Sequence, residues 1–123
     1  MRTFACLLLL LSISTPALAA LSGADLLKRC TASEKSMHGE PLTAEESLDS
    51  MWCIGYLSGM LDGFGVGDYK VGDEKFACPG EAGVTRSEAL GITVKYLREH
   101  PDDIEKSGRR SLLLALAKAF PCK

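Results

Sequence analysis

The sequence is poor in the residues that build catalytic and metal sites. It has only two histidines, His38 and His100, which lie far apart, and no Cys-x-x-Cys pair. Clustered Cys and His ligands of a structural metal site are therefore not expected. No histidine base can be paired with a nucleophile, and His100 fits a solvated position at a helix end. The sequence predicts a protein that is not an enzyme and has no cofactor or metal.

An excess of positive charge is also missing. The chain has 14 Lys and Arg against 16 Asp and Glu, a formal net charge of −2. No basic stripe is available to displace counterions from a nucleic-acid backbone. The glycines of residues 63–67 lack the Gly-Lys-Ser/Thr ending of a phosphate-binding loop, and Asp62, Asp68 and Asp73 do not have EF-hand spacing. No polar–apolar alternation is long enough to predict a sheet.

One apolar run is present, and it lies at the N-terminus. Arg2 precedes the apolar segment 4–13, and Ala17-Leu18-Ala19 supplies the small residues of a signal-peptidase site. We expect cleavage after Ala19, which makes residues 1–19 a signal peptide and residues 20–123 a single domain. A retained membrane anchor is the alternative, but the run is short for crossing a bilayer. The leader predicts a periplasmic protein.

Cleavage would remove Cys6 and leave an even number of cysteines: Cys30, Cys53, Cys78 and Cys122. In a small exported domain this predicts two disulfides. Residues equidistant from the turn of a helical hairpin lie side by side, which favours Cys30–Cys53 and Cys78–Cys122. The pairing Cys30–Cys122 with Cys53–Cys78 stays open, because sequence alone cannot choose among three connectivities.

Helix start signals indicate the fold class. Ser22, Thr43 and Thr85 each have an acidic residue three positions later, which is capping-box spacing. A final helix is expected from about Asp102 to Ala119, with Pro121 preventing its continuation. These signals predict an all-α fold, a small four- to five-helix bundle with two disulfides.

The expected final helix contains one unfavourable residue and one acidic cluster. Gly108 would cost about 1 kcal/mol relative to alanine in a helix interior. Asp102, Asp103 and Glu105 would fall in the first turn, where carboxylates complement the helix dipole. We therefore expect these three acids to form a solvated helix start.

The helix that follows Thr43 has one broad face of apolar residues and glycines at helical spacing. Its members are Leu48, Met51, Trp52, Gly55, Tyr56, Gly59 and Met60. Gly55 and Gly59 would let another backbone approach closely. Tight packing inside the bundle and contact in a homodimer are both open explanations for them.

A long glycine-rich connection, residues 62–84, joins the second and third expected helices. Connections of this length are uncommon inside a compact domain and are often functional. Cys78 ties the segment to the rest of the chain. Position on this segment alone makes four residues candidates for binding a partner: Asp68, Tyr69, Asp73 and Phe76. For each aromatic residue, a place in the core is the competing explanation.

Four segments together resemble a known family: Cys53 to Gly63, Cys78-Pro79 leading to Val84-Thr85, Val94 to Pro101, and Ala115 to Cys122. In this order and spacing the chain resembles the Tai/Rap family of type VI secretion immunity proteins. The resemblance implies a periplasmic, all-helical, disulfide-bonded and often dimeric protein. It also implies a partner, a peptidoglycan amidase effector whose papain-like Cys-His active site is occluded.

The shared positions are mainly cysteines, glycines and apolar core residues, so the resemblance transfers no toxin-contacting residue. A periplasmic structural or stress-related protein with the same fold and no toxin partner is the alternative. A carrier of a small ligand is less favoured, because the apolar faces are only large enough to form a core.

Overall fold

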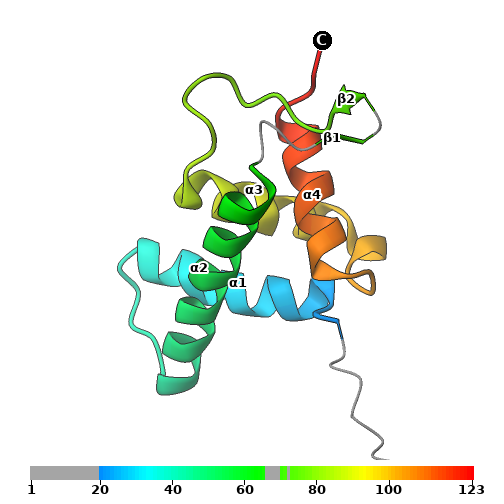
Figure 1. The fold of residues 1–123 in the computed structure, drawn as a ribbon. Helices are drawn as coiled ribbons and strands as arrows, with labels where there is room; N and C mark the ends of the chain where they lie inside the picture. The colour runs from blue at the N-terminus through cyan, green and yellow to red at the C-terminus, as the bar shows by residue number, and fades with distance from the viewer. Residues whose placement is uncertain (1–19, 66–69, 72) are drawn as a thin grey trace, which may run out of the picture.

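The computed structural model describes residues 20–65, 70–71 and 73–123 (Figure 1). These residues form four α-helices, one short 3-10 helix and two short strands. In chain order they are α1 (Gly23–Met37), α2 (Ala44–Phe64), β1 (Lys70–Val71), β2 (Glu74–Lys75), α3 (Arg86–Glu99), η1 (Pro101–Asp103) and α4 (Gly108–Ala119). The predicted all-α bundle is confirmed.

The three predicted capping boxes begin the first three long helices. Ser22, Thr43 and Thr85 each accept a hydrogen bond from the third helical N–H, and the carboxylate at that third position accepts one from the cap N–H. Hydrogen bonds from the cap residue also lower the pKa of Asp25 and of Glu88. Each helix start is thus fixed by a local exchange of hydrogen bonds that needs no tertiary contact.

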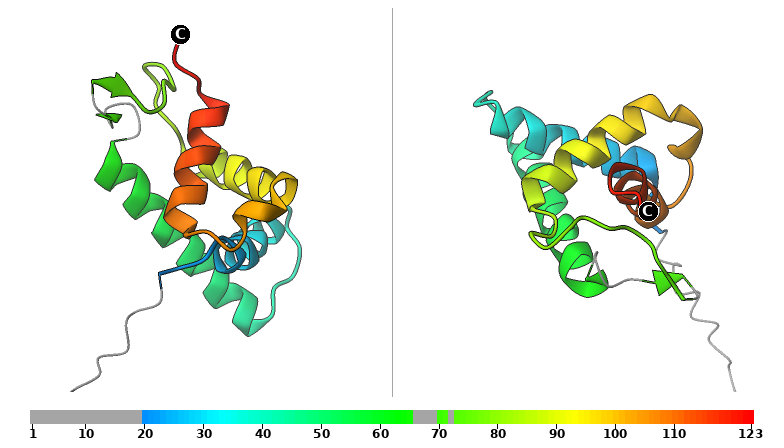
Figure 2. Two further views of the ribbon diagram at one scale, coloured as in Figure 1. Left: turned by 90° about the vertical axis from the view of Figure 1, so that its right-hand side faces the viewer. Right: turned by 90° about the horizontal axis from the view of Figure 1, so that it is seen from above.

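The helices pack as two pairs around one core. α1 packs mainly on α2, α3 crosses both, and α4 packs on α3 and α1 (Figure 2). The side chains at their centre are almost wholly buried: Leu26, Leu57, Leu90, Val94, Leu97, Leu112 and Leu116. Removal of this apolar surface from water is the main force that holds the bundle together.

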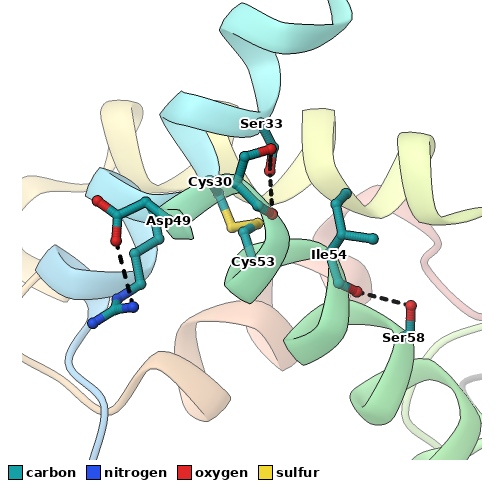
Figure 3. Close-up of a disulfide and its surroundings, with 8 residues drawn as sticks. Cys30, Ser33, Asp49, Cys53, Ile54 and Ser58 are labelled. Atoms are coloured by element: carbon teal, nitrogen blue, oxygen red, sulfur yellow. Dashed lines mark hydrogen bonds and ion pairs between the residues drawn. A yellow bond between two sulfur atoms is a disulfide. The ribbon is translucent and has the colours of Figure 1, made fainter. Parts of the chain in front are cut away.

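Both favoured disulfide pairings are confirmed. Cys30 of α1 is bonded to Cys53 of α2, and Cys78 is bonded to Cys122 near the end of the chain, each with a Cα–Cα distance of 5.1 Å. Figure 3 shows the first bridge between the two helices, with Ser33 beside it. The hydroxyl of Ser33 donates to the carbonyl oxygen of Ser50 at 3.0 Å.

The expected start of the final helix is wrong. Pro101 begins η1, and α4 starts only at Gly108, with the Ser107 hydroxyl accepting from the Arg110 N–H. The backbone approaches Leu21 closely at this start, since the Gly108 N–H donates to the carbonyl oxygen of Leu21 at 2.6 Å. A Cβ there would lie 3.0 Å from Leu21 Cδ2, so a residue that is unfavourable inside a helix suits this close approach.

Within the acidic cluster, Asp102 and Glu105 are exposed as expected, but the expectation of a solvated residue is wrong for Asp103. Asp103 is buried and accepts a hydrogen bond from the Tyr96 hydroxyl at 2.5 Å, and it also forms an ion pair with Lys106. The hydrogen bonds from Lys106 and then Tyr96 lower the pKa of Asp103. Burial, followed by the bond to Asp103, raises the pKa of Tyr96 to about 12. Asp103 therefore fastens η1 to α3.

The beginning of α1 is bound to the connection between η1 and α4. The Gly23 N–H donates to Lys106 O at 2.8 Å, and the Ala24 N–H donates to Ile104 O at 2.9 Å. An isolated bridge also pairs Ser22 with Ser107. These bonds satisfy N–H groups that have no partner within their own helix.

A short hairpin replaces part of the expected irregular connection. β1 and β2 are antiparallel, with Lys70 opposite Lys75 and Val71 opposite Glu74. Two residues per strand are too few for the alternation from which a strand is predicted. The hairpin lies beside the C-terminal end of α4, far from the α1–α2 turn (Figures 1 and 2).

Candidate functional site

Metal ligands, free cysteines and membrane-spanning helices are the first features to look for among the described residues. They contain no group of three His, Cys, Asp or Glu that could hold a metal ion. All four cysteines of this part of the chain are in disulfides, so none is a free thiolate. None of the helices described is long and apolar enough to cross a membrane.

His100 lies at the C-terminal end of α3, as expected, but it is packed against neighbouring side chains rather than solvated. It is half-buried and its ring stacks on Tyr96 with centroids 4.1 Å apart. Nδ1 lies 2.7 Å from the carbonyl oxygen of Tyr96, and Nε2 lies 3.0 Å from the ammonium of Lys118. Both contacts are made when neutral His100 carries its proton on Nδ1. Nδ1 thus holds the ring against α3, and Nε2 joins it to α4.

The first candidate surface surrounds the hairpin, and we call it the hairpin surface. It consists of Lys70, Asp73, Glu74, Lys75, Phe76, Cys78, Cys122 and Lys123. Asp73, predicted as a partner-binding residue, is exposed in the hairpin turn. Asp68 and Tyr69, predicted for the same role, lie outside the described residues.

Phe76, the fourth predicted residue, is half-buried at the base of the hairpin. It lines a groove of about 460 Å³ together with residues of α4 that include Arg109, Arg110 and Leu113. The ring is thus neither a core residue nor fully presented to solvent. It joins the hairpin to the outer side of α4.

The hairpin surface is attached to the bundle just after β2. Ala77 is fully buried, and the Cys78 N–H donates to Phe120 O at 2.8 Å. The Cys78–Cys122 bridge follows, and Cys122 Sγ lies 3.5 Å from Lys75 O. This short segment holds the hairpin against the end of α4.

The second candidate surface lies on α2, and we call it the α2 face. It consists of Leu48, Met51, Gly55 and Gly59, all of which are exposed. Leu48 and Met51 keep 64% and 65% of their surface in contact with solvent. They lie away from the core, because the buried positions among the described side chains of this helix are Asp49, Cys53 and Leu57.

The two glycines of the α2 face have open space around them. Apart from the chain neighbours and the nearby backbone of α2 itself, no described heavy atom lies within 4 Å of a Cβ built on Gly55 or Gly59. Tight packing inside the bundle, one of the two explanations considered for them, is therefore wrong. No charged residue occurs between Asp49 and Asp62. This stretch without charge is the feature of the sequence that indicates an uncharged exposed surface, because a solvated helix face normally carries charged residues.

Side chains flanking the α2 face fix the rotation of α2. Trp52 stacks on Tyr56 with ring centroids 5.0 Å apart, and the Arg29 guanidinium lies 4.6 Å from the Trp52 ring centre. Arg29 also pairs with the buried carboxylate of Asp49 at 3.4 Å. The α2 face is thus a rigid, uncharged strip supported from α1.

Comparison with known proteins gives one match. The family model of the Rap1a immunity proteins matches residues 22–122. The matched range includes all four α-helices, both disulfides and the hairpin surface except Lys123. No curated protein and no solved structure shows significant similarity to the chain.

Proposed function

This chain belongs to the family of Rap1a immunity proteins, and on that premise we propose that it binds and inhibits a peptidoglycan amidase effector of the type VI secretion system. It acts by stoichiometric binding, with no chemistry of its own. The observation that carries the proposal is the family match over residues 22–122. The segments from which the Tai/Rap resemblance was inferred lie within that range.

The proposed compartment is the periplasm, where an amidase reaches the cell wall. Residues 1–19 would serve as the signal peptide and residues 20–123 as the exported domain. The two disulfides support this location, because structural disulfides form and persist in oxidising compartments, whereas the cytosol keeps thiols reduced.

The hairpin surface is the proposed contact with the amidase. It projects at the end of α4 and presents the exposed Asp73, with Phe76 at its base. Asp68 and Tyr69 belong to the same connection and complete the proposed contact set. A projecting segment suits the groove that holds a papain-like active site. Its attachment through Cys78 reduces the conformational entropy lost on binding.

The α2 face is the proposed surface for a homodimer. It offers exposed apolar side chains at Leu48 and Met51, and its glycines leave room for a second backbone. A two-fold axis through this strip would set the same uncharged residues against each other. Burial of this apolar strip would favour association.

The proposed function is tested by titrating residues 20–123 into a purified peptidoglycan amidase effector, taken from any effector gene adjacent to this one, and following the release of peptidoglycan fragments. We expect hydrolysis to stop at one chain per amidase. Asp73→Arg should weaken inhibition at least about tenfold, since reversing a contact charge costs 1.4 kcal/mol or more at an interface hot spot.

Glu40→Arg is the matched control, because Glu40 is exposed in the α1–α2 turn, away from the hairpin. It should inhibit like the unsubstituted chain. Undiminished hydrolysis at a large excess of the unsubstituted chain contradicts the function. Equal inhibition by Asp73→Arg and Glu40→Arg contradicts the proposed surface.

A further inference from the structure

The two disulfides differ sharply in their access to solvent. Cys30 and Cys53 are 0% exposed and lie between α1 and α2 (Figure 3). Cys78 and Cys122 are both exposed to solvent. Thiol–disulfide exchange requires a thiolate to reach one of the two sulfur atoms. A reductant can therefore reach Cys78–Cys122, which we call the outer bridge, while the chain is folded. It can reach Cys30–Cys53, the inner bridge, only after the bundle opens.

The outer bridge lies in a groove that has room for a reductant. The groove has a volume of about 500 Å³ and is lined by Glu74, Lys75, Cys78, Cys122 and Lys123. The lining carries charges of both signs, from Lys75, Lys123 and Glu74. Access to the sulfur atoms, rather than local charge, therefore favours reaction at this bridge.

The outer bridge also holds a segment that has little stability of its own. An isolated two-stranded hairpin is at best marginally stable in water. This one has two residues per strand and places Lys70 directly opposite Lys75, an unfavourable pair of like charges. Its attachment depends on Phe76 beside α4, buried Ala77, the Cys78–Phe120 hydrogen bond and the disulfide.

We propose that Cys78–Cys122 is a redox-reactive site of this chain, opened by a dithiol reductant while Cys30–Cys53 stays closed. A thiolate of the reductant attacks one Sγ, the S–S bond breaks, and the other cysteine leaves as a thiolate. The second thiol of the reductant then attacks the mixed disulfide. The reductant becomes a disulfide, and the chain gains two electrons and two protons as a pair of thiols.

Opening of this bridge releases the hairpin surface while the four-helix core stays folded. The core keeps its apolar contacts and the Cys30–Cys53 bridge, neither of which involves the hairpin. The consequence for amidase binding rests on the proposed function. A released hairpin must be ordered again on binding, so reduction is expected to weaken inhibition.

The test measures the order of reduction in the oxidised chain without denaturant. Dithiothreitol is added, free thiols are trapped with iodoacetamide at timed intervals, and the modified cysteines are identified by peptide mass spectrometry. Cys78 and Cys122 should be modified at least about tenfold faster than Cys30 and Cys53, because exchange at a buried bridge is limited by rare opening of the bundle. Far-UV circular dichroism should stay unchanged while only the outer pair is modified.

A variant tests the release of the hairpin separately. Cys78→Ser with Cys122→Ser should retain the helical signal, and trypsin should cut it after Lys75 at least about tenfold faster than the oxidised chain, since local opening exposes that peptide bond. Modification of all four cysteines at the same rate would overturn the proposal. Loss of the helical signal when only the outer bridge is reduced would overturn it too. So would equal cleavage of the two forms.

The experiments can refute the redox proposal and the proposed function independently of each other. Ordered reduction with release of the hairpin supports the reactive bridge even where the chain does not inhibit an amidase. Inhibition of the amidase together with simultaneous reduction of both bridges leaves the immunity function standing and overturns the redox proposal.

Discussion

Replacing Gly23 by alanine should destabilise the bundle, although glycine is normally the poorer residue in a helix. Gly23 is buried at the first position of α1, against the connection between η1 and α4. A Cβ there would lie 2.8 Å from Asp103 O and 2.9 Å from Ile104 O. Both atoms belong to the backbone, so α1 must move away, and the Gly23–Lys106 hydrogen bond weakens.

The expected loss follows from the cost of overpacking, about 1–3 kcal/mol of unfolding free energy. In a domain of this size each kcal/mol lowers the melting temperature by roughly 4–8 °C. Gly91→Ala is the matched control, because Gly91 lies inside α3 with no described atom within 4 Å of its Cβ position. There alanine should stabilise by about 0.5–1 kcal/mol. The same chemical change should thus have opposite signs at the two positions.

The assay is urea denaturation of the oxidised chain, followed by far-UV circular dichroism. Gly108→Ala should fall between the other two variants, because its nearest neighbour is the side chain of Leu21, at 3.0 Å, which can move. A Gly23→Ala variant as stable as the unsubstituted chain, or as stable as Gly91→Ala, would refute the close docking of α1.

Three further substitutions test other parts of the structure. Thr93→Val should raise the unfolding free energy measured by urea denaturation by about 1 kcal/mol, because the buried Thr93 hydroxyl has no hydrogen-bond partner among the described residues. Unchanged or lower stability of the variant would contradict this reasoning. Asp103 has a folded pKa below its ordinary 3.8, so its ionised form stabilises the fold above that pH, and the contribution is lost as the pH falls through the lowered value. Asp103→Asn should therefore be less stable in neutral urea titrations but lose less on acidification than the unsubstituted chain; an equal acid loss contradicts the assignment. Met51→Asp should leave circular dichroism unchanged and reduce the mass measured by light scattering from dimer to monomer, and an unchanged dimer excludes the α2 face.

The helix starts were predictable because their signals are local. Ser22, Thr43 and Thr85 each exchange hydrogen bonds with a residue three positions away, so the pattern and its physical cause lie within one turn. The disulfide pairing could be favoured but not chosen from the sequence, because the geometry of helical hairpins does not exclude Cys30–Cys122 with Cys53–Cys78.

The start of α4 and the partners of Asp103 depend on contacts between distant segments. Gly108 begins the helix because Leu21 lies against it, and Asp103 is buried because Tyr96 supplies a hydroxyl from α3. Neither contact can be recognised from a periodic pattern in the sequence around Gly108 or Asp103. The short strands were missed because two residues cannot show alternation.

The candidate surfaces were predictable only in part. The length and glycine content of residues 62–84 indicated a functional connection, but they did not show that Phe76 would line a groove on α4. Helical spacing placed Leu48 and Met51 on one face without showing which side of α2 faced the core. The Cys30–Cys53 bridge and the Arg29–Asp49 pair fix that rotation.

The most direct test of the immunity function is a contact-dependent competition on solid medium. The parent strain, once its type VI secretion system is shown to be active, competes against a mutant that lacks this gene and any adjacent effector gene. The mutant carries either the full gene or a copy without residues 1–19. We predict that the parent kills the mutant and that only the full gene protects it. Equal survival of all mutants would contradict periplasmic immunity.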